Sequence, residues 1–208
     1  MSPELPQPLD VIAVGAHPDD VEIGVGGILA AHRAAGARII IATLSRGSCG
    51  GAGAVRVEEA RASATLLGAE LRMGDFPDTR LDSQIIPWLE RLIGEVKPSV
   101  VYTHSSADRH QDHRAVHEAT LVAARSVGSV YCYEAPSTTV DFKPARFVDV
   151  SGYMPQKHAA LEAFKSQNGR AYLATGMIES TARYWGRFAG HGMVEPLEVV
   201  REAVSVAA

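Results

Sequence analysis

The chain has 208 residues, of which 46% are hydrophobic and 21% are charged, and its formal net charge is −4. This length suits one α/β domain with a sizeable core, and the composition is typical of a globular protein. A small negative charge without runs of basic residues argues against a nucleic-acid partner, and no apolar run is long enough to span a membrane.

Two further features concern the compartment. Residues 1–8 are rich in proline and lack the basic and apolar regions of a signal peptide. The two cysteines, Cys49 and Cys132, form no CxxC motif and cannot build a disulfide framework. We therefore expect a cytoplasmic protein.

Strand-like and helix-like segments alternate through the first two thirds of the chain, which predicts a parallel sheet covered by helices on both faces. The predicted strands cover residues 9–15, 38–44, 70–73, 99–104 and 130–133. The predicted helices cover residues 20–35, 55–67, 87–96 and 112–126. Gly36 and Gly68 follow two of these helices, where a left-handed residue often ends a helix.

The last third has a different character. A short strand over residues 147–150 and helices over 153–164 and 180–188 are predicted to cover one end of the sheet. We therefore expect a single domain over residues 1–208, with a core at about 9–150 and a C-terminal cover at about 151–208.

Two polar motifs each follow a predicted strand. The run VIAVG ends at AHPDDVE, which holds His17, Asp19 and Asp20, and the run VVYT precedes His110-Gln111-Asp112-His113. If the first and fourth strands are neighbours, both motifs lie at the switch point of the sheet, where ligands bind beyond the strand ends.

The residue types in these motifs suit a catalytic zinc site. Such sites usually have three ligands drawn from His and carboxylate, and we predict His17, Asp20 and His113. The same triad also suits ferrous iron. In the alternative interpretation, an aspartate only caps the following helix. His117, one helical turn after His113, is an alternative ligand.

The other residues of the motifs suggest acid–base chemistry. Asp19 is the candidate general base, although spacing alone does not decide which aspartate does which job. His110 is a candidate to stabilise an oxyanion or protonate a leaving amine, and Asp112 to orient His110 and favour its charged form. Glu22 is either a partner of the ligands or a first-turn acid.

Three other features of the sequence could signal function. A dinucleotide site is excluded because the glycines after the first strand are spaced G-x-G-G and no acid lies between Glu22 and Glu58. The glycine-rich residues 45–54 form a lid or a plain connection, and Cys49 within them lacks the partners of a nucleophile. The remaining four histidines are expected at surface or packing positions: His32, His104, His158 and His191.

The paired motifs resemble the PIG-L/LmbE family of zinc-dependent deacetylases, whose signature is A-H-P-D-D-x-E with a later H-x-D-H. Further likeness lies in Arg56-x-x-Glu59-Ala60 and in a K…AL…KSQ segment that starts at Lys157. The resemblance implies a Rossmann-like three-layer α/β sandwich with a mostly parallel sheet. Several family members are oligomers, so it also implies a homo-oligomer.

The resemblance also implies roles. It makes His17, Asp20 and His113 the zinc ligands, Asp19 the base, His110 the residue that stabilises the oxyanion and Asp112 the residue that tunes it. Arg56 and Asp78 fall where family members contact the sugar. Gly47-Ser48-Cys49-Gly50 replaces the acid-containing loop common in the family, which leaves the particular substrate open.

We therefore predict a Zn²⁺-dependent hydrolase that removes the acetyl group of an N-acetylglucosamine-type amino sugar or conjugate. One alternative is a sugar- or metal-binding member of the same fold without catalysis. The other is a nucleotide-dependent oxidoreductase or transferase.

Overall fold

The computed structural model describes residues 9–203, and all structural statements concern these residues. Residues 1–8, on which the signal-peptide prediction depends, lie outside this range, as do residues 204–208 of the predicted domain. Among the described helices, none has the length and apolar character needed to cross a bilayer.

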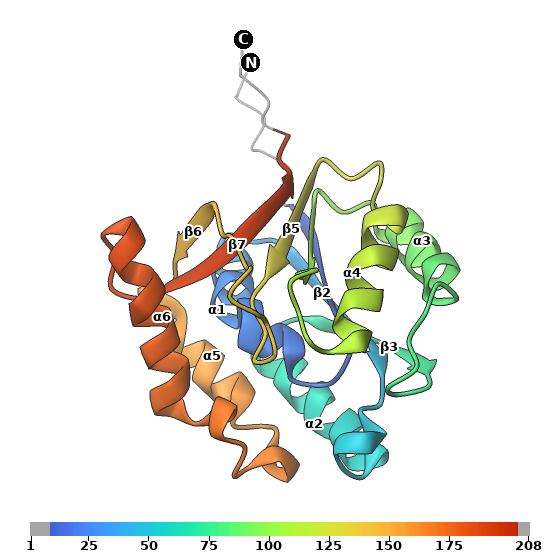
Figure 1. The fold of residues 1–208 in the computed structure, drawn as a ribbon, viewed down its shortest axis with the longest axis horizontal. Coiled ribbons are helices and arrows are strands. Elements are labelled where there is room, and N and C mark those ends of the chain that lie inside the picture. Colours follow the sequence, from blue (N-terminus) through green and yellow to red (C-terminus); the bar gives the residue numbers. More distant parts are fainter. Residues whose placement is uncertain (1–8, 204–208) are drawn as a thin grey trace.

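One sheet runs through the middle of the molecule (Figure 1), with the strand order β3-β2-β1-β4-β5-β7-β6. Strands β1 to β5 are parallel, and β7 pairs antiparallel with both β5 and β6. The strands are β1 Asp10–Gly15, β2 Arg38–Ser45, β3 Glu70–Phe76, β4 Val100–His104, β5 Ser129–Tyr133, β6 Arg146–Asp149 and β7 Val194–Arg201. The mostly parallel sheet and the pairing of the first strand with the fourth are confirmed.

Helices cover both faces of the sheet. Side chains of β1 alternate between the faces: Val11 and Ala13 pack with α1, α2, α5 and α6, whereas Ile12 and Val14 pack with α3 and α4. The helices are α1 Asp20–Ala34, α2 Gly53–Leu66, α3 Ile85–Val96, α4 Gln111–Ala123, α5 Met154–Leu161 and α6 Thr175–Ala189. The predicted three-layer sandwich is confirmed.

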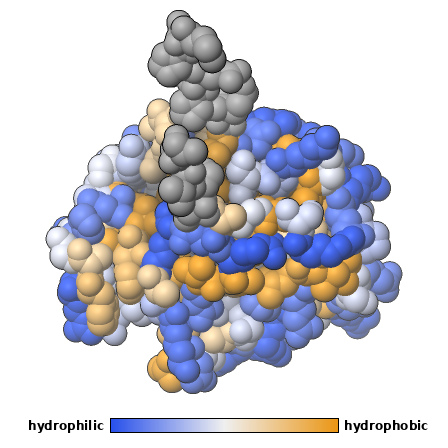
Figure 2. Space-filling view, turned by 90° about the horizontal axis from the view of Figure 1, so that it is seen from above, coloured by the Kyte–Doolittle hydropathy of each residue, from blue (hydrophilic) through white to orange (hydrophobic). Residues whose placement is uncertain are grey.

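Strands β1 to β5 begin at the upper edge of the sheet in Figure 1 and end at the opposite edge, whereas β7 runs the other way. Figure 2 views the first edge from above, where hydrophilic residues run across an apolar band. The two polar motifs follow the carboxyl ends of β1 and β4 and therefore lie at the other edge.

The C-terminal part of the chain departs most from the prediction. Strand β7 was not predicted, yet it is inserted into the sheet between β5 and β6. Its sequence contains Pro196, which cannot donate a ladder hydrogen bond and is unusual inside a sheet. Helix α6 starts at Thr175 instead of residue 180, and α5 ends at Leu161 instead of residue 164.

Helix α1 is broken one turn after the first motif. Val25 has non-helical angles (φ −136°, ψ 18°), which interrupt the helix at this point. Gly27 donates to Glu195 of β7 at 2.9 Å, and the Nζ of Lys157 donates to Ile23 at 2.6 Å. Lys157 and Glu195 form a buried ion pair at 2.6 Å. This pair satisfies the backbone groups that the break leaves free.

The G-x-G-G run allows close packing of α1. A Cβ at Gly24 would lie 2.2 Å from the ring of Tyr133, and a Cβ at Gly27 would lie 2.8 Å from Val150. These glycines therefore let β5 and the segment after β6 approach the helix. Close packing therefore accounts for Gly24 and Gly27. Gly36 and Gly68 have positive φ angles, as expected after a helix end.

We expect Lys157→Met to lower the free energy of unfolding by about 3–5 kcal/mol, because Glu195 would stay buried without its partner. Denaturant unfolding followed by circular dichroism measures the change. Arg38→Met is the control: it breaks the exposed pair with Glu70 and should cost less than about 1 kcal/mol. Equal losses in the two variants would show that the buried pair contributes little.

Candidate active site

The side chains of both motifs meet at the carboxyl ends of β1 and β4. His17 and Asp19 lie in the turn between β1 and α1, Asp20 is the first residue of α1, and His110 and His113 lie at the start of α4. They converge because β1 and β4 pair directly in parallel, which brings their ends to the same edge of the sheet. The sequence prediction that the two motifs form one site is thereby met in the described structure.

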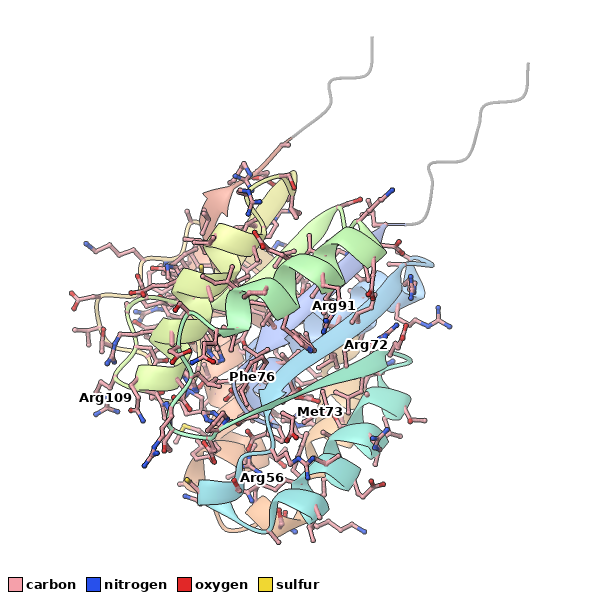
Figure 3. The ribbon with its side chains drawn as sticks, turned by 90° about the vertical axis from the view of Figure 1, so that its right-hand side faces the viewer. Arg56, Arg72, Met73, Phe76, Arg91 and Arg109 are labelled. Atoms are coloured by element: carbon pink, nitrogen blue, oxygen red, sulfur yellow. The ribbon has the colours of Figure 1, made fainter. Side chains whose placement is uncertain are left out.

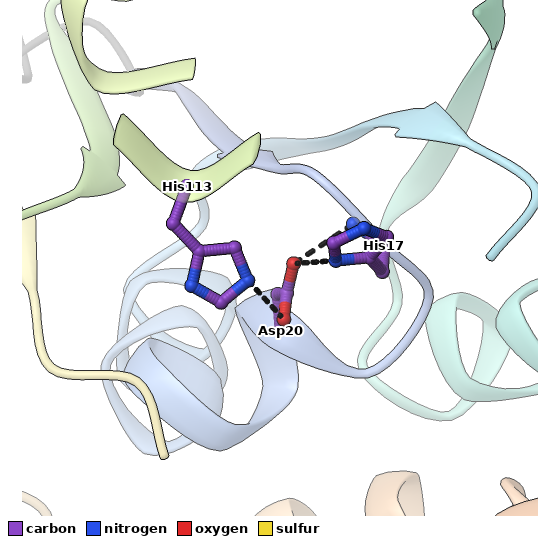
Figure 4. Close-up of side chains that lie close together, drawn as sticks. All are labelled: His17, Asp20 and His113. Carbon is purple, nitrogen blue, oxygen red and sulfur yellow. Dashed lines mark hydrogen bonds and ion pairs between the residues drawn. The ribbon is translucent and has the colours of Figure 1, made fainter. Parts of the chain in front are cut away.

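Asp20 lies between two imidazoles (Figure 4). Its Oδ1 is 3.4 Å from Nε2 of His113, and its Oδ2 is 3.4 Å from Nδ1 of His17. One ligand atom from each of the three residues lies within 4.8 Å of the others, and all three side chains are buried. Asp20 accepts a hydrogen bond from the amide of His17, and Asp19, at the N-cap, makes no side-chain cap bond. The two aspartates therefore do not act as helix caps.

Each imidazole also contacts a carboxylate through its other ring nitrogen. Nδ1 of His113 is 3.0 Å from Asp108, and Nε2 of His17 is 3.2 Å from Asp112 and 3.1 Å from Asp78. Histidines that bind metals usually donate their second N–H to a carboxylate in this way, which fixes the tautomer and ring orientation. The donor set and its supporting carboxylates thus fit a divalent cation.

The electrostatics of the cluster favour positive charge. Burial opposes protonation of His17, but its hydrogen bonds with Asp112, Asp20 and Asp78 raise its pKa to about 12. For His113, burial is likewise outweighed by Asp20 and Asp108, and the pKa rises to about 9. The carboxylates around the two imidazoles therefore favour a positive charge at this position. A divalent cation would supply such a charge.

Asp19 has a strained backbone and one free oxygen. Its φ is 95°, which is uncommon for a residue other than glycine and is often found at functional sites. The residue is 4% exposed, and its buried Oδ2 has no hydrogen-bond partner. Burial, together with the charge of Asp20, raises the pKa of Asp19 to about 8 although Arg56 opposes the shift. The free oxygen is available to a reactant.

Arg56 holds the backbone around Asp19. Its guanidinium donates to the carbonyls of Pro18 at 2.6 Å and Gly47 at 2.9 Å, and to Oδ1 of Asp19 at 3.3 Å. It is 5% exposed and lies inside the molecule, whereas Arg109 projects outward (Figure 3). Most of its donors are thus engaged within the protein, so its contact with a sugar stays a prediction.

Asp78 is engaged in a similar way. One carboxylate oxygen accepts from the amide of Cys49 at 2.6 Å, and the other contacts His17. The hydrogen bond with His17 is the largest cause that holds the pKa of Asp78 below its usual range. Asp78 therefore links the residue 45–54 segment to the cluster, and its predicted sugar contact also stays open.

His110 and Asp112 are arranged differently from the prediction. The carboxylate of Asp112 contacts His17 and accepts from the amides of Thr79 and Leu81, not from His110. The amide of Asp112 instead donates to Nδ1 of His110 at 3.2 Å. Burial and the charge of His113 lower the pKa of His110, which favours the neutral ring. With Nδ1 as acceptor, its Nε2 carries the proton.

A cavity of about 410 Å³ opens over these groups. His17, Asp19, Asp20, His110 and His113 line it. Arg56, Asp78, Arg109, Gln167 and Arg170 also line it. The cavity therefore combines a cluster suited to a metal with a polar wall that offers hydrogen-bond donors and charges.

Comparison with known proteins is consistent with this geometry. Residues 12–124 match the family model PIG-L, described as GlcNAc-PI de-N-acetylase, and this range contains both motifs. The chain belongs to the PIG-L family.

Relatives of this PIG-L protein include deacetylases. The uncharacterized deacetylase YaiS of Escherichia coli K12 is 40% identical over 167 residues, covering 75% of this chain and 90% of YaiS. The diacetylchitobiose deacetylase of Thermococcus kodakarensis is 26% identical over 220 residues, covering 91% of this chain and 82% of the relative. The chain is thus a member of a deacetylase family.

Solved structures share the fold over nearly the whole chain. The conserved protein TT1542 from Thermus thermophilus has a TM-score of 0.85 at 28% identity, covering 95% of this chain and 97% of its own. GalB, the 4-carboxy-2-hydroxymuconate hydratase from Pseudomonas putida KT2440, has a TM-score of 0.81 at 23% identity. The match covers 96% of this chain and 99% of GalB. Because a hydratase shares the fold, the reaction must be argued from the site itself.

Sequence reasoning missed two residues of the site in this PIG-L protein. His104 was expected at a surface or packing position, but it is fully buried beside the cluster. Its Nε2 lies 3.2 Å from Oδ2 of Asp20, and its ring stacks on that of His113 with the ring centroids 3.9 Å apart. Asp108, the partner of His113, was not predicted as a site residue. His104 is the last residue of β4, and this position at the carboxyl end of a parallel strand was the available signal.

Two alternatives from the sequence are also resolved. His117 does not join His113: its Nδ1 contacts the carbonyl of His104 at 2.9 Å, and it is absent from the candidate ligand groups of the described residues. Glu22 is buried and accepts from Ser63 of α2 at 2.8 Å. Glu22 therefore connects α1 to α2 through this hydrogen bond.

Proposed function

We propose that this PIG-L protein is a metal-dependent amide hydrolase that removes the acetyl group from an N-acetylglucosamine-type amino sugar or conjugate. The observation that carries the proposal is the buried carboxylate Asp20 between two imidazoles, each supported by a further carboxylate. Next to it lies Asp19 with one free oxygen, in a cavity open to a small molecule.

His17, Asp20 and His113 would hold the cation, for which zinc is our first candidate and ferrous iron the second. When bound, such a cation polarises a carbonyl and lowers the pKa of water from 15.7 to about 7. The protein residues then have to orient the amide, accept a proton and return it.

Asp19 is the proposed general base. Its free oxygen accepts a proton from the attacking water and later delivers it to the leaving nitrogen. The water oxygen bonds to the carbonyl carbon, the carbon–nitrogen bond breaks, and the products are acetate and a free amine. Arg56 keeps Asp19 in place through Pro18 and Gly47, which makes Arg56 a positioning residue.

His110 is the proposed donor to the oxyanion. Its Nδ1 accepts from the amide of Asp112, so the proton resides on Nε2. A neutral imidazole with Nε2–H donates one hydrogen bond without bringing a further positive charge next to His17 and His113. Asp112 therefore supports the site by orienting both His17 and His110.

The proposed substrate class is supported by the relatives. The family model is described as a GlcNAc-PI de-N-acetylase, and one relative is named a diacetylchitobiose deacetylase. The polar wall of the cavity, with Arg109, Gln167 and Arg170, offers partners for sugar hydroxyls or an attached polar group. We propose that the substrate is a small molecule of the cytoplasm.

The alternative is a protein of the same fold that binds sugar or metal and does not release acetate. The free oxygen of Asp19 favours the enzyme, because a purely structural carboxylate this deeply buried is normally hydrogen-bonded through both oxygens.

The test is acetate release from a panel of N-acetylglucosamine conjugates. We expect equal amounts of acetate and free amine, loss of release with a chelator, and recovery when zinc is added back. Iron add-back without oxygen tests the second metal. Protein that binds one zinc but releases no acetate from any member of the panel would contradict the proposal and favour the binding protein.

A further inference from the structure

A second cavity of about 430 Å³ adjoins the active-site cavity. Ile23, Pro136 and Tyr172 line both cavities. Ile23 lies in the first turn of α1, three residues after Asp20, so the second cavity begins next to the proposed reaction centre. Its other walls come from α5, α6, the segment after β5 and the start of β7.

The walls of this second cavity are mainly apolar. Met177, Ile178 and Ala182 of α6 contribute to it, together with Val194 and Pro196 of β7. Apolar residues therefore make up most of these walls, as in pockets for apolar groups.

The charged groups in these walls have partners of their own. Lys157 pairs with Glu195 at 2.6 Å, and Glu134 accepts from the indole of Trp185 at 2.7 Å. The Lys157–Glu195 ion pair is therefore neutralised within the protein, and Glu134 keeps its hydrogen bond when an apolar group occupies the cavity.

The two cavities differ in the side chains that line them. The first is lined by the cluster and by Arg109, Gln167 and Arg170, whereas the second, which begins at Ile23, is lined mainly by apolar residues. An N-acyl amino sugar has the same polarity: a sugar on the nitrogen and a hydrocarbon on the carbonyl carbon. With the amide at the cluster and the sugar against the polar wall, the acyl substituent extends past Ile23.

We infer that the second cavity is an acyl-chain site and that the enzyme accepts linear acyl groups longer than acetyl on its amino sugar. The inference rests on the proposed function and extends it. The reaction is unchanged: water adds to the carbonyl carbon, the carbon–nitrogen bond breaks, the nitrogen takes a proton, and the products are a fatty carboxylate and the free amine.

The first test compares N-acetyl-, N-butyryl- and N-hexanoylglucosamine, with the released amine as readout. Each added methylene that enters the cavity should raise kcat/KM by about three- to four-fold, so the butyryl substrate should exceed the acetyl one by about tenfold. If kcat/KM is lower for both longer substrates than for the acetyl substrate, the acyl site is overturned and the deacetylase proposal stays intact. Release from none of them, with zinc present, overturns both.

A variant that fills the cavity locates the effect. Thr181 is an exposed residue of α6 that lines the chamber, so Thr181→Phe should abolish the preference for longer chains and leave acetyl hydrolysis unchanged. Ser180→Phe places the same ring on the adjacent exposed residue, which does not line the cavity, and should behave as wild type. The same chain-length preference in the two variants would contradict this location.

A binding measurement tests the acyl site with ligands that contain no sugar. Hexanoate and acetate are the acyl products, and titration calorimetry of the zinc-loaded protein compares them directly. We expect hexanoate to bind more than about tenfold tighter than acetate in wild type, and Thr181→Phe to remove the difference. Equal affinities in wild type would overturn the acyl site.

Discussion

Asp19→Asn is expected to lower turnover by about 10²–10⁴-fold while the bound metal is retained. The amide of asparagine cannot accept a proton from water, and Asp19 is not among the three proposed ligands. Asparagine also tolerates the positive φ of this position better than most residues, so the turn should persist. Steady-state acetate release and metal analysis by mass spectrometry give the two readouts.

The matched control is Asp75→Asn, which makes the same chemical change at an exposed aspartate near the end of β3. It should leave both turnover and metal content unchanged. Undiminished turnover in Asp19→Asn would refute its role as the base. Loss of metal in Asp19→Asn would instead assign this side chain to the metal site.

Substitutions around His113 should reduce metal affinity in a graded order. His113→Ala removes a proposed ligand and should lower affinity and activity most. Asp108→Asn removes the carboxylate 3.0 Å from Nδ1 of His113 and should reduce affinity by about 10–100-fold. Competition with a chromogenic zinc chelator measures these affinities.

His117→Gln is the control for this series, because His117 follows His113 on the same helix and contacts the carbonyl of His104 instead of the cluster. It should leave metal affinity unchanged. A loss in His117→Gln as large as in His113→Ala would revive the alternative ligand pair and contradict the proposed triad.

Much of the fold follows from local sequence pattern. The strands β1, β2, β4 and β5 can be recognised in the sequence because buried parallel strands are continuously apolar. Strand β7 cannot, since Glu195 and Pro196 interrupt its pattern. The reason for Glu195 is tertiary: it accepts the amides freed by the break in α1, which no local pattern predicts.

The site was predictable where residue type and position in the fold agreed. The clustering of His17, Asp20 and His113 was predictable because each follows a strand at the switch point of the sheet. His104 was missed because a histidine inside an apolar strand resembles a packing residue until the partner Asp20 is known. The orientation of Asp112 toward His17 depends on side-chain geometry that spacing does not contain.

The central claim is that His17, Asp20 and His113 bind one divalent cation. The most direct measurement is a crystal structure of zinc-loaded protein with anomalous diffraction at the zinc edge. The claim predicts a single strong anomalous peak about 2.0–2.2 Å from a nitrogen of each histidine and an oxygen of Asp20. A peak elsewhere, or a cluster without a peak in protein shown to contain zinc, would contradict it.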